Sequence, residues 1–285
     1  MTVHHLDCAT MCPYGGRRLL GSGGPLTGRL VGHCLLIETD RGLVLVDTGF
    51  GTGDVADPGR LGRAFLTAVR PRLTLAGTAL HRIRALGHDP RDVRHIVLTH
   101  LDADHAGGLG DFPEARVHVL AEELAAARTL ATRGERDRYR PVQWAHRPHW
   151  VEHRAGGEEW HGFRAVRPLP GLDPDILLVP LPGHSRGHSG VAVRTGANWL
   201  LHCGDAYFSH TDLDPALRRP PALTLFQRMV AFDDRARRDN LDRLRALRRD
   251  HTGAVRLICA HDPADLPTPV PATARPLPDR TSEPH

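Results

Sequence analysis

Two stretches of the chain share one pattern of apolar runs separated by a turn. In residues 33–50, two apolar runs flank an Asp-Arg-Gly turn, and the second run ends at Asp47. In residues 188–208, two apolar runs flank a Thr-Gly-Ala-Asn turn, and an acidic residue, Asp205, follows the second run. Short apolar runs joined by such turn residues predict two β-hairpins.

Each predicted hairpin is followed by a helical stretch and then by a β-rich run that ends in histidine. These runs cover residues 93–100 and 254–261, so they end at His100 and His261. The parallel predicts two related α/β halves, each placing an aspartate and a histidine at strand ends. Because the strands themselves are committed to the core, ligands in layered α/β folds bind at strand ends and in the loops that leave them.

Apolar residues elsewhere recur at helical spacing, as Leu241, Leu244 and Leu247 do. We expect helices over residues 60–88, broken at Pro71 and ending at Gly87, over residues 122–129, and over residues 240–249 behind a cap at Asp239 or Asn240.

The length of 285 residues accommodates one large domain or two small ones. We predict a single domain over residues 1–262. The remaining residues, 263–285, are rich in proline, so we predict an extended and partly disordered tail. A chain of this length buries enough apolar surface to fold without a disulfide or a structural metal, so any metal site is expected to serve chemistry.

Composition excludes several classes of mechanism and partner. All 37 basic residues are arginine, which excludes a Schiff-base lysine, a P-loop and a Ser-Lys pair. The net charge of +4 comes from arginines scattered beside 33 acidic residues, so we expect no nucleic-acid partner. The odd number of five cysteines indicates a reduced compartment. The first residues do not resemble a leader, and no long apolar run occurs, so we expect a cytoplasmic protein with no membrane partner.

The candidate chemistry is concentrated after the first predicted strand end, where residues 100–108 read His-Leu-Asp-Ala-Asp-His-Ala-Gly-Gly. Four candidate metal ligands there converge if the strand ends at His100 and a helix begins near Asp104. Three further candidates follow predicted strands or turns. The full set is His100, Asp102, Asp104, His105, His184, Asp205 and His261. Four histidines and three aspartates are enough for two divalent cations with one bridging carboxylate, which suits Zn²⁺ first, with Mn²⁺ or Fe²⁺ as alternatives.

The remaining histidines are interpreted as background, facing solvent or lying at helix ends. They include His4, His5, His81, His88, His118 and His251. A rival reading is a serine hydrolase, because residues 183–187 match G-x-S-x-G and Ser185, Asp205 and His261 follow the order of a catalytic triad. That motif must open a helix, whereas a predicted strand follows here, so the metal reading is favoured.

Together the motifs resemble the five ordered motifs of the metallo-β-lactamase superfamily, and their spacing is most similar to that of its N-acyl homoserine lactonase-type branch. They are VDTG at Asp47, THLDADHAGG around His100, PGHS at His184, GDA at Asp205 and AHD at His261. The resemblance implies an α/β fold, an αββα sandwich of two mixed β-sheets flanked by helices. A dinuclear site would lie where the pseudo-duplicated halves meet.

Carried over by position, the resemblance implies a role for each candidate. His100, Asp102 and His184 would hold the first metal, Asp104, His105 and His261 the second, Asp205 would bridge the two, and Asp47 would fix loop geometry. The implied activity is hydrolysis by a metal-bridging hydroxide that opens an ester-like bond, first of all a lactone, with Asp104 relaying the proton. The alternatives are a thioester or phosphotriester hydrolase on the same site and a non-catalytic metal-binding protein of the same fold.

The chain departs from the family pattern at two positions. Asp102 stands where the family string has histidine, and its negative charge is expected to raise the pKa of metal-bound water and to favour Mn²⁺ or Fe²⁺. Phe208 stands where lactonase relatives place a tyrosine that polarises the carbonyl. Tyr207, one residue earlier, is a candidate for that catalytic role, and a packing role is the equal alternative.

We expect a small-molecule substrate, and the sequence carries no signal for the oligomeric state. Residues 139–150 contain two tryptophans and several arginines, which suits either a loop over a pocket or a helix packed on a sheet. The helical stretch 60–88 is the other candidate wall of the pocket.

Overall fold

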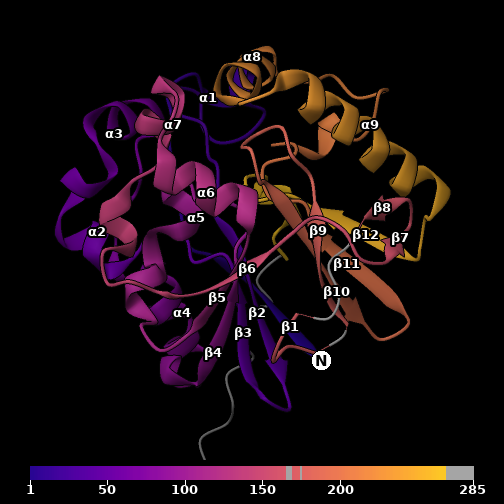
Figure 1. The fold of residues 1–285 in the computed structure, drawn as a ribbon. Helices are drawn as coiled ribbons and strands as arrows, with labels where there is room; N and C mark the ends of the chain where they lie inside the picture. The colour runs from indigo at the N-terminus through magenta and orange to yellow at the C-terminus, as the bar shows by residue number, and fades with distance from the viewer. Residues whose placement is uncertain (165–168, 174, 268–285) are drawn as a thin grey trace, which may run out of the picture.

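The first half of the chain forms a six-stranded mixed sheet (Figure 1). The structure is a computed structural model that describes residues 1–164, 169–173 and 175–267. Its strands lie in chain order: β1 (Thr2–Asp7), β2 (His33–Thr39), β3 (Gly42–Val46), β4 (Val93–Val97), β5 (Arg116–Leu120) and β6 (His149–His153). The pairs β1–β2 and β2–β3 are antiparallel, whereas β3 to β6 run parallel.

The second sheet has the order β12-β11-β10-β9. Its strands are β9 (Ile176–Pro180), β10 (Ser189–Thr195), β11 (Asn198–His202) and β12 (Val255–Ile258), and a separate small hairpin consists of β7 (Glu159–Trp160) and β8 (Phe163–Arg164). The hairpin β10–β11 is antiparallel and β12 pairs parallel to β11, as β4 does to β3. The internal repeat predicted from the sequence is therefore present in the fold.

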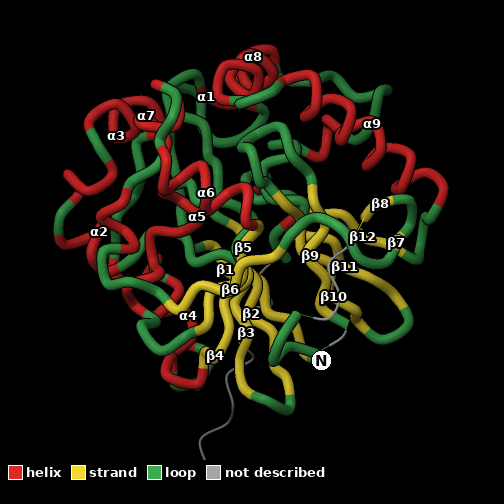
Figure 2. Tube along the Cα trace, in the orientation of Figure 1, coloured by secondary structure: helices red, strands yellow, loops and turns green. Residues whose placement is uncertain are grey.

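Helices lie on the outer sides of the two sheets, as Figure 2 shows. The α-helices are α1 (Gly16–Leu20), α2 (Thr52–Ala56), α3 (Arg63–Val69), α4 (Ala79–Ala85), α5 (Ala103–Ala106), α6 (Ala121–Thr129), α7 (Arg133–Arg138), α8 (Pro221–Val230) and α9 (Asp234–Asp250). The 3-10 helices are η1 (Pro58–Leu61), η2 (Leu75–Gly77), η3 (Pro90–Asp92), η4 (Gly107–Asp111), η5 (Pro141–Trp144), η6 (His210–Asp212) and η7 (Pro263–Asp265).

Three apolar clusters account for the layers. Alternate residues of the first sheet, such as Leu35 and Ile37, pack with Val191 and Val193 of the second sheet between the two sheets. The opposite face of the first sheet packs against α4 and α6, and the opposite face of the second packs against α9. This is the expected αββα sandwich.

The predicted helices are partly correct. Helix α6 lies where expected, and α3 and α4 occupy the stretch 60–88 with Pro71 between them. The expected start of the last helix was wrong: α9 begins at Asp234, and its N-cap is Asp233, whose carboxylate accepts a hydrogen bond from the Ala236 amide. Arginine and aspartate fill the exposed face of this first turn, so the apolar pattern alone marks only the later turns.

Two predictions concern the ends and surface of the domain. Of the predicted tail, Pro263–Asp265 forms the single turn η7, and residues 268–285 lie outside the described part of the chain. The single domain over residues 1–262 stays a prediction. None of the described helices is long and apolar enough to cross a membrane.

Candidate metal centre

The repeated strand ends bring the seven predicted ligands together. His100 follows β4, Asp104 and His105 lie on the short helix α5, and His184 lies in the loop between β9 and β10. Asp205 follows β11 and His261 follows β12, so the second half contributes from equivalent positions. Their side chains form three overlapping groups in which the ligand atoms lie within 4.8 Å of one another: His100, Asp102 and His184; Asp104, His105 and His261; and His100, His105 and Asp205.

The first group surrounds one carboxylate oxygen of Asp102. Its Oδ2 lies 3.0 Å from Nε2 of His184 and 3.4 Å from Nε2 of His100. Oδ2 of Asp205 also lies 3.5 Å from Nε2 of His184 and 3.8 Å from Nε2 of His100.

The second group faces Oδ1, the other carboxylate oxygen of Asp205. Oδ1 of Asp205 lies 3.4 Å from Nε2 of His105 and 3.1 Å from Nε2 of His261. Asp104 Oδ2 completes this group, 3.8 and 3.6 Å from the same two nitrogens. Oδ2 of Asp205 thus faces the first group and Oδ1 faces the second, while Nε2 of His261 lies 3.1 Å from both oxygens. A carboxylate between two groups of ligands is the arrangement a bridging ligand requires.

The donor set fits a pair of cations. Nε2 of His100, Nε2 of His105 and Oδ1 of Asp205 are buried and have no hydrogen-bond partner among the described residues. Nδ1 of His261 donates to the Val31 carbonyl at 2.8 Å, so in the neutral ring the Nε2 lone pair is directed into the centre. Although burial opposes it, the charges of Asp205 and Asp104 raise the pKa of His105 well above its ordinary value, so these aspartates favour a positive charge beside His105.

Asp47 holds the first half of the centre from behind. It directly follows β3 and has a left-handed φ of 54°, a conformation that non-glycine residues adopt at a cost. Its carboxylate accepts hydrogen bonds from Nδ1 of His105 at 2.8 Å and from the amide and hydroxyl of Thr99 at 2.8 and 2.7 Å. These bonds direct Nε2 of His105 toward the centre.

A largely buried arginine faces the unusual ligand Asp102. Nη1 of Arg138, the last residue of α7, lies 3.3 Å from Oδ2 of Asp102. Although burial opposes ionisation, the charges of Arg138 and His100 hold the pKa of Asp102 well below its usual range. Arg138 also donates to the Val230 carbonyl at the end of α8. The extra negative charge that replaces a family histidine is therefore balanced within the site, by a residue that the sequence motifs do not reveal.

Glu123 of α6 joins the two loops that carry the first group. Its buried carboxylate accepts hydrogen bonds from the amides of Leu101 and Gly187, both at 3.0 Å, and from the hydroxyl of Tyr139 at 3.1 Å. Ser185 donates its hydroxyl to the same carboxylate at 2.7 Å. This contact gives Ser185 a structural partner other than His261, and β10 rather than a helix follows it, so the triad reading has no geometric support.

The structure does not bring Tyr207 to the centre. Its side chain is fully buried in the core of the second half, and burial raises the pKa of its hydroxyl well above the ordinary value. The neighbouring Phe208 faces the centre instead, with its ring centroid 4.7 Å from that of His261.

A pocket of about 420 Å³ opens beside the ligands and is lined by Asp102, Asp104, His184, Asp205 and His261. Much of its wall is apolar: Leu61, Phe65, Val69, Phe208, Phe226 and Met229. The stretch 60–88 thus lines the pocket as expected. From residues 139–150, Tyr139 and Arg140 line it, whereas Trp144 and Trp150 pack against the core of the first half. The contributions of α7 and α8 were not predicted.

The fold and the clustered ligands are those of a metallo-β-lactamase-type protein, and the family model of the metallo-beta-lactamase superfamily matches residues 27–261. The chain belongs to this superfamily. It is 46% identical over 261 residues to a probable metallo-hydrolase of Mycobacterium tuberculosis, a match covering 92% of this chain and 80% of the relative. It is 28% identical over 163 residues to an N-acyl homoserine lactonase of Bacillus thuringiensis, covering 57% of this chain and 58% of the lactonase.

Solved structures agree on the fold. An N-acyl homoserine lactone hydrolase with N-hexanoyl-L-homoserine at its catalytic metal centre superimposes with a TM-score of 0.69 at 20% identity, covering 92% of this chain and 93% of the other. A dizinc quorum-quenching lactonase gives a TM-score of 0.57 at 16% identity, with coverages of 92% and 87%. The chain is thus a metal-dependent hydrolase by family, with lactonases among its relatives.

Proposed function

We propose that the protein is a dinuclear metal hydrolase that opens an ester-like bond, with a lactone as the first choice of substrate. The observation that carries this proposal is Asp205, whose carboxylate lies between two adjoining groups of histidine and aspartate beside an open pocket. His100, Asp102 and His184 would hold one cation and Asp104, His105 and His261 the other, with Zn²⁺ first and Mn²⁺ or Fe²⁺ as alternatives. When bound, such cations lower the pKa of a water molecule and polarise the bond to be cleaved.

The residues around the centre have separable tasks in this proposal. Asp104 belongs to the second group and also lines the pocket, so its carboxylate is placed to accept and pass on a proton. Asp47 and Glu123 hold the ligand-bearing loops. Arg138 balances the charge of Asp102, so the centre carries the same formal charge as one built with histidine at that position.

The pocket favours an apolar substrate portion. Phe65, Phe208 and Phe226 lie in its wall, and the volume of about 420 Å³ suits a small molecule. A short acyl chain or an aromatic ring would lie along this wall with its scissile bond next to Asp205. The lactonase relative and the product-bound lactone hydrolase support a lactone as the class to test first.

The test is an activity panel on protein of known metal content. Lactones, aryl esters, thioesters and phosphotriesters are assayed before chelation, after chelation and after return of Zn²⁺ or Mn²⁺. We expect chelator-sensitive lactone hydrolysis, its loss in His184→Ala, and its retention in His149→Ala, which removes an exposed histidine of β6.

Each other result decides against part of the proposal. Turnover confined to thioesters or phosphotriesters would contradict the lactone assignment but would still support the metal centre. Bound metal without turnover of any class would indicate a binding protein. Turnover that survives chelation but is abolished in Ser185→Ala with normal metal content would overturn the dinuclear mechanism.

A further inference from the structure

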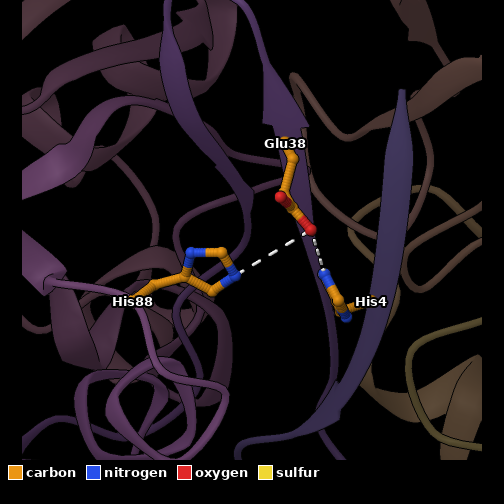
Figure 3. Close-up of side chains that lie close together, drawn as sticks. All are labelled: His4, Glu38 and His88. Atoms are coloured by element: carbon orange, nitrogen blue, oxygen red, sulfur yellow. Dashed lines mark hydrogen bonds and ion pairs between the residues drawn. The ribbon is translucent and has the colours of Figure 1, made fainter.

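Three side chains outside the candidate centre converge on the first sheet. His4 lies on β1, Glu38 on the neighbouring β2, and His88 in the turn after α4 (Figure 3). His4 and His88 were interpreted from the sequence as background histidines that face solvent or lie at helix ends. The fold brings together residues that are 34 and 50 positions from Glu38 in the chain.

The three functional groups point at one another. Nε2 of His4 lies 2.6 Å and Nε2 of His88 lies 3.9 Å from the same oxygen, Oε1 of Glu38. The ligand atoms of all three residues lie within 4.8 Å of one another. In the described part of the chain, the ion pairs of Glu38 are those with these two histidines, so no arginine competes for its charge.

The separations suit a cation between the three groups. Zn–N and Zn–O bonds of about 2.1 Å in tetrahedral geometry place ligand atoms about 3.4 Å apart, between the two observed distances. Modest side-chain rotations would therefore complete the site. The side chains retain 26% exposure for each histidine and 39% for Glu38, which leaves an entry path and room for a water as a fourth ligand.

The cluster is separate from the candidate centre. Glu38 pairs with Leu43 at the first part of β3, whereas Asp47 follows the last residue of that strand. The two sites thus lie toward opposite ends of the strands of the first sheet. A cation bound here would leave the ligands around Asp205 untouched.

We propose that His4, Glu38 and His88 form a third divalent-cation site, of the zinc class, that ties the edge strand β1 to β2 and to the turn after α4. Two imidazoles and one carboxylate are donors that Zn²⁺ accepts without a thiolate. Because the site joins three segments distant in sequence, binding stabilises the folded chain rather than a local turn. An anchored β1 also keeps the edge of β2 paired.

The test compares Glu38→Gln with Glu122→Gln, an exposed glutamate on α6, in protein without a polyhistidine tag. Both variants and the wild type are saturated with Zn²⁺ and dialysed against micromolar free Zn²⁺, and zinc per chain is measured. Wild type and Glu122→Gln should each hold one more equivalent of zinc than Glu38→Gln. Zn²⁺ should also raise the melting temperature of these two proteins by more than it raises that of Glu38→Gln. A His4→Ala/His88→Ala double variant should match Glu38→Gln.

The readout does not depend on turnover, so the result stands whether or not the hydrolase proposal is correct. Equal zinc content in wild type and Glu38→Gln would overturn the third site. A difference that appears only at millimolar Zn²⁺ would overturn it as well, because it would report a surface pair of histidines rather than a formed site.

Discussion

The pair formed by Asp102 and Arg138 gives the sharpest test of how this centre is built. Asp102 replaces a histidine of the family motif, and Arg138 places a positive charge 3.3 Å away. We predict that Asp102→His and Arg138→Met each damage the protein, and that the double variant recovers much of the loss. The double variant has the same formal charge at these two positions as the wild type, because both members of the pair become neutral.

The magnitude follows from the geometry. At an effective dielectric constant of about 20, two charges 3.3 Å apart attract by about 5 kcal/mol before desolvation is counted. Their side chains are only 13% and 18% exposed, so solvent screens the pair weakly. Removing one member takes away this attraction and leaves the other largely buried without its oppositely charged partner, which costs about 3 kcal/mol. The double variant loses the pair interaction once, whereas the sum of the two single losses counts it twice. We therefore expect the double variant to lose about 3 kcal/mol less than that sum.

The assay measures unfolding by urea in chelator at neutral pH, which reports the pair without bound metal. Metal content after dialysis against zinc is the second readout. Asp102→His leaves the positive charge of Arg138 unbalanced beside the first group, so it should weaken the first cation by about 10- to 100-fold. The double variant should regain most of that affinity.

Two outcomes would refute this reasoning. Additive losses of stability would mean that Arg138 and Asp102 are not energetically coupled. Full metal content in Asp102→His alone would mean that Arg138 serves only to hold the Val230 carbonyl at the end of α8.

Three further predictions concern buried groups. Glu123→Gln should lower metal affinity by about 10-fold, measured by chelator competition, because its carboxylate holds both ligand-bearing loops; exposed Glu122→Gln is the control. Tyr207→Phe should keep full activity in a kinetic assay and lose less than about 1 kcal/mol in urea unfolding, since its hydroxyl is buried with no hydrogen-bond partner among the described residues. Burial, with the charges of two neighbouring histidines, lowers the pKa of His118 to about 3, so the unfolded chain binds its proton first. This residue should therefore lower the free energy of unfolding of the wild type by about 1.4 kcal/mol per pH unit as the pH drops from 6.5 toward 3. In His118→Gln, the free energy of unfolding should fall less steeply over the same pH range.

The parts of the fold that could be predicted are those fixed by local pattern. The strands ending before Asp47 and Asp205 were identified because apolar runs stop at a turn, and the repeat placed both acids at matching strand ends. Strand β1 was not predicted, since Thr2–Asp7 contains two histidines and becomes a strand only by pairing with β2. The burial of His118 was missed for the same reason: neighbouring strands, not its own segment, supply its partners His95 and His153.

The residues that support the centre could not be found from their own surroundings in the sequence. Glu123 occupies the first turn of α6, where an acidic residue is ordinary because it complements the helix dipole. Its function arises only because α6 packs against two loops from distant parts of the chain. The departure at Asp102 did contain usable information, since an added buried charge requires a balancing one nearby. Any of the 37 basic residues could have met that requirement, and only the packing of α7 against the ligand loops selects Arg138.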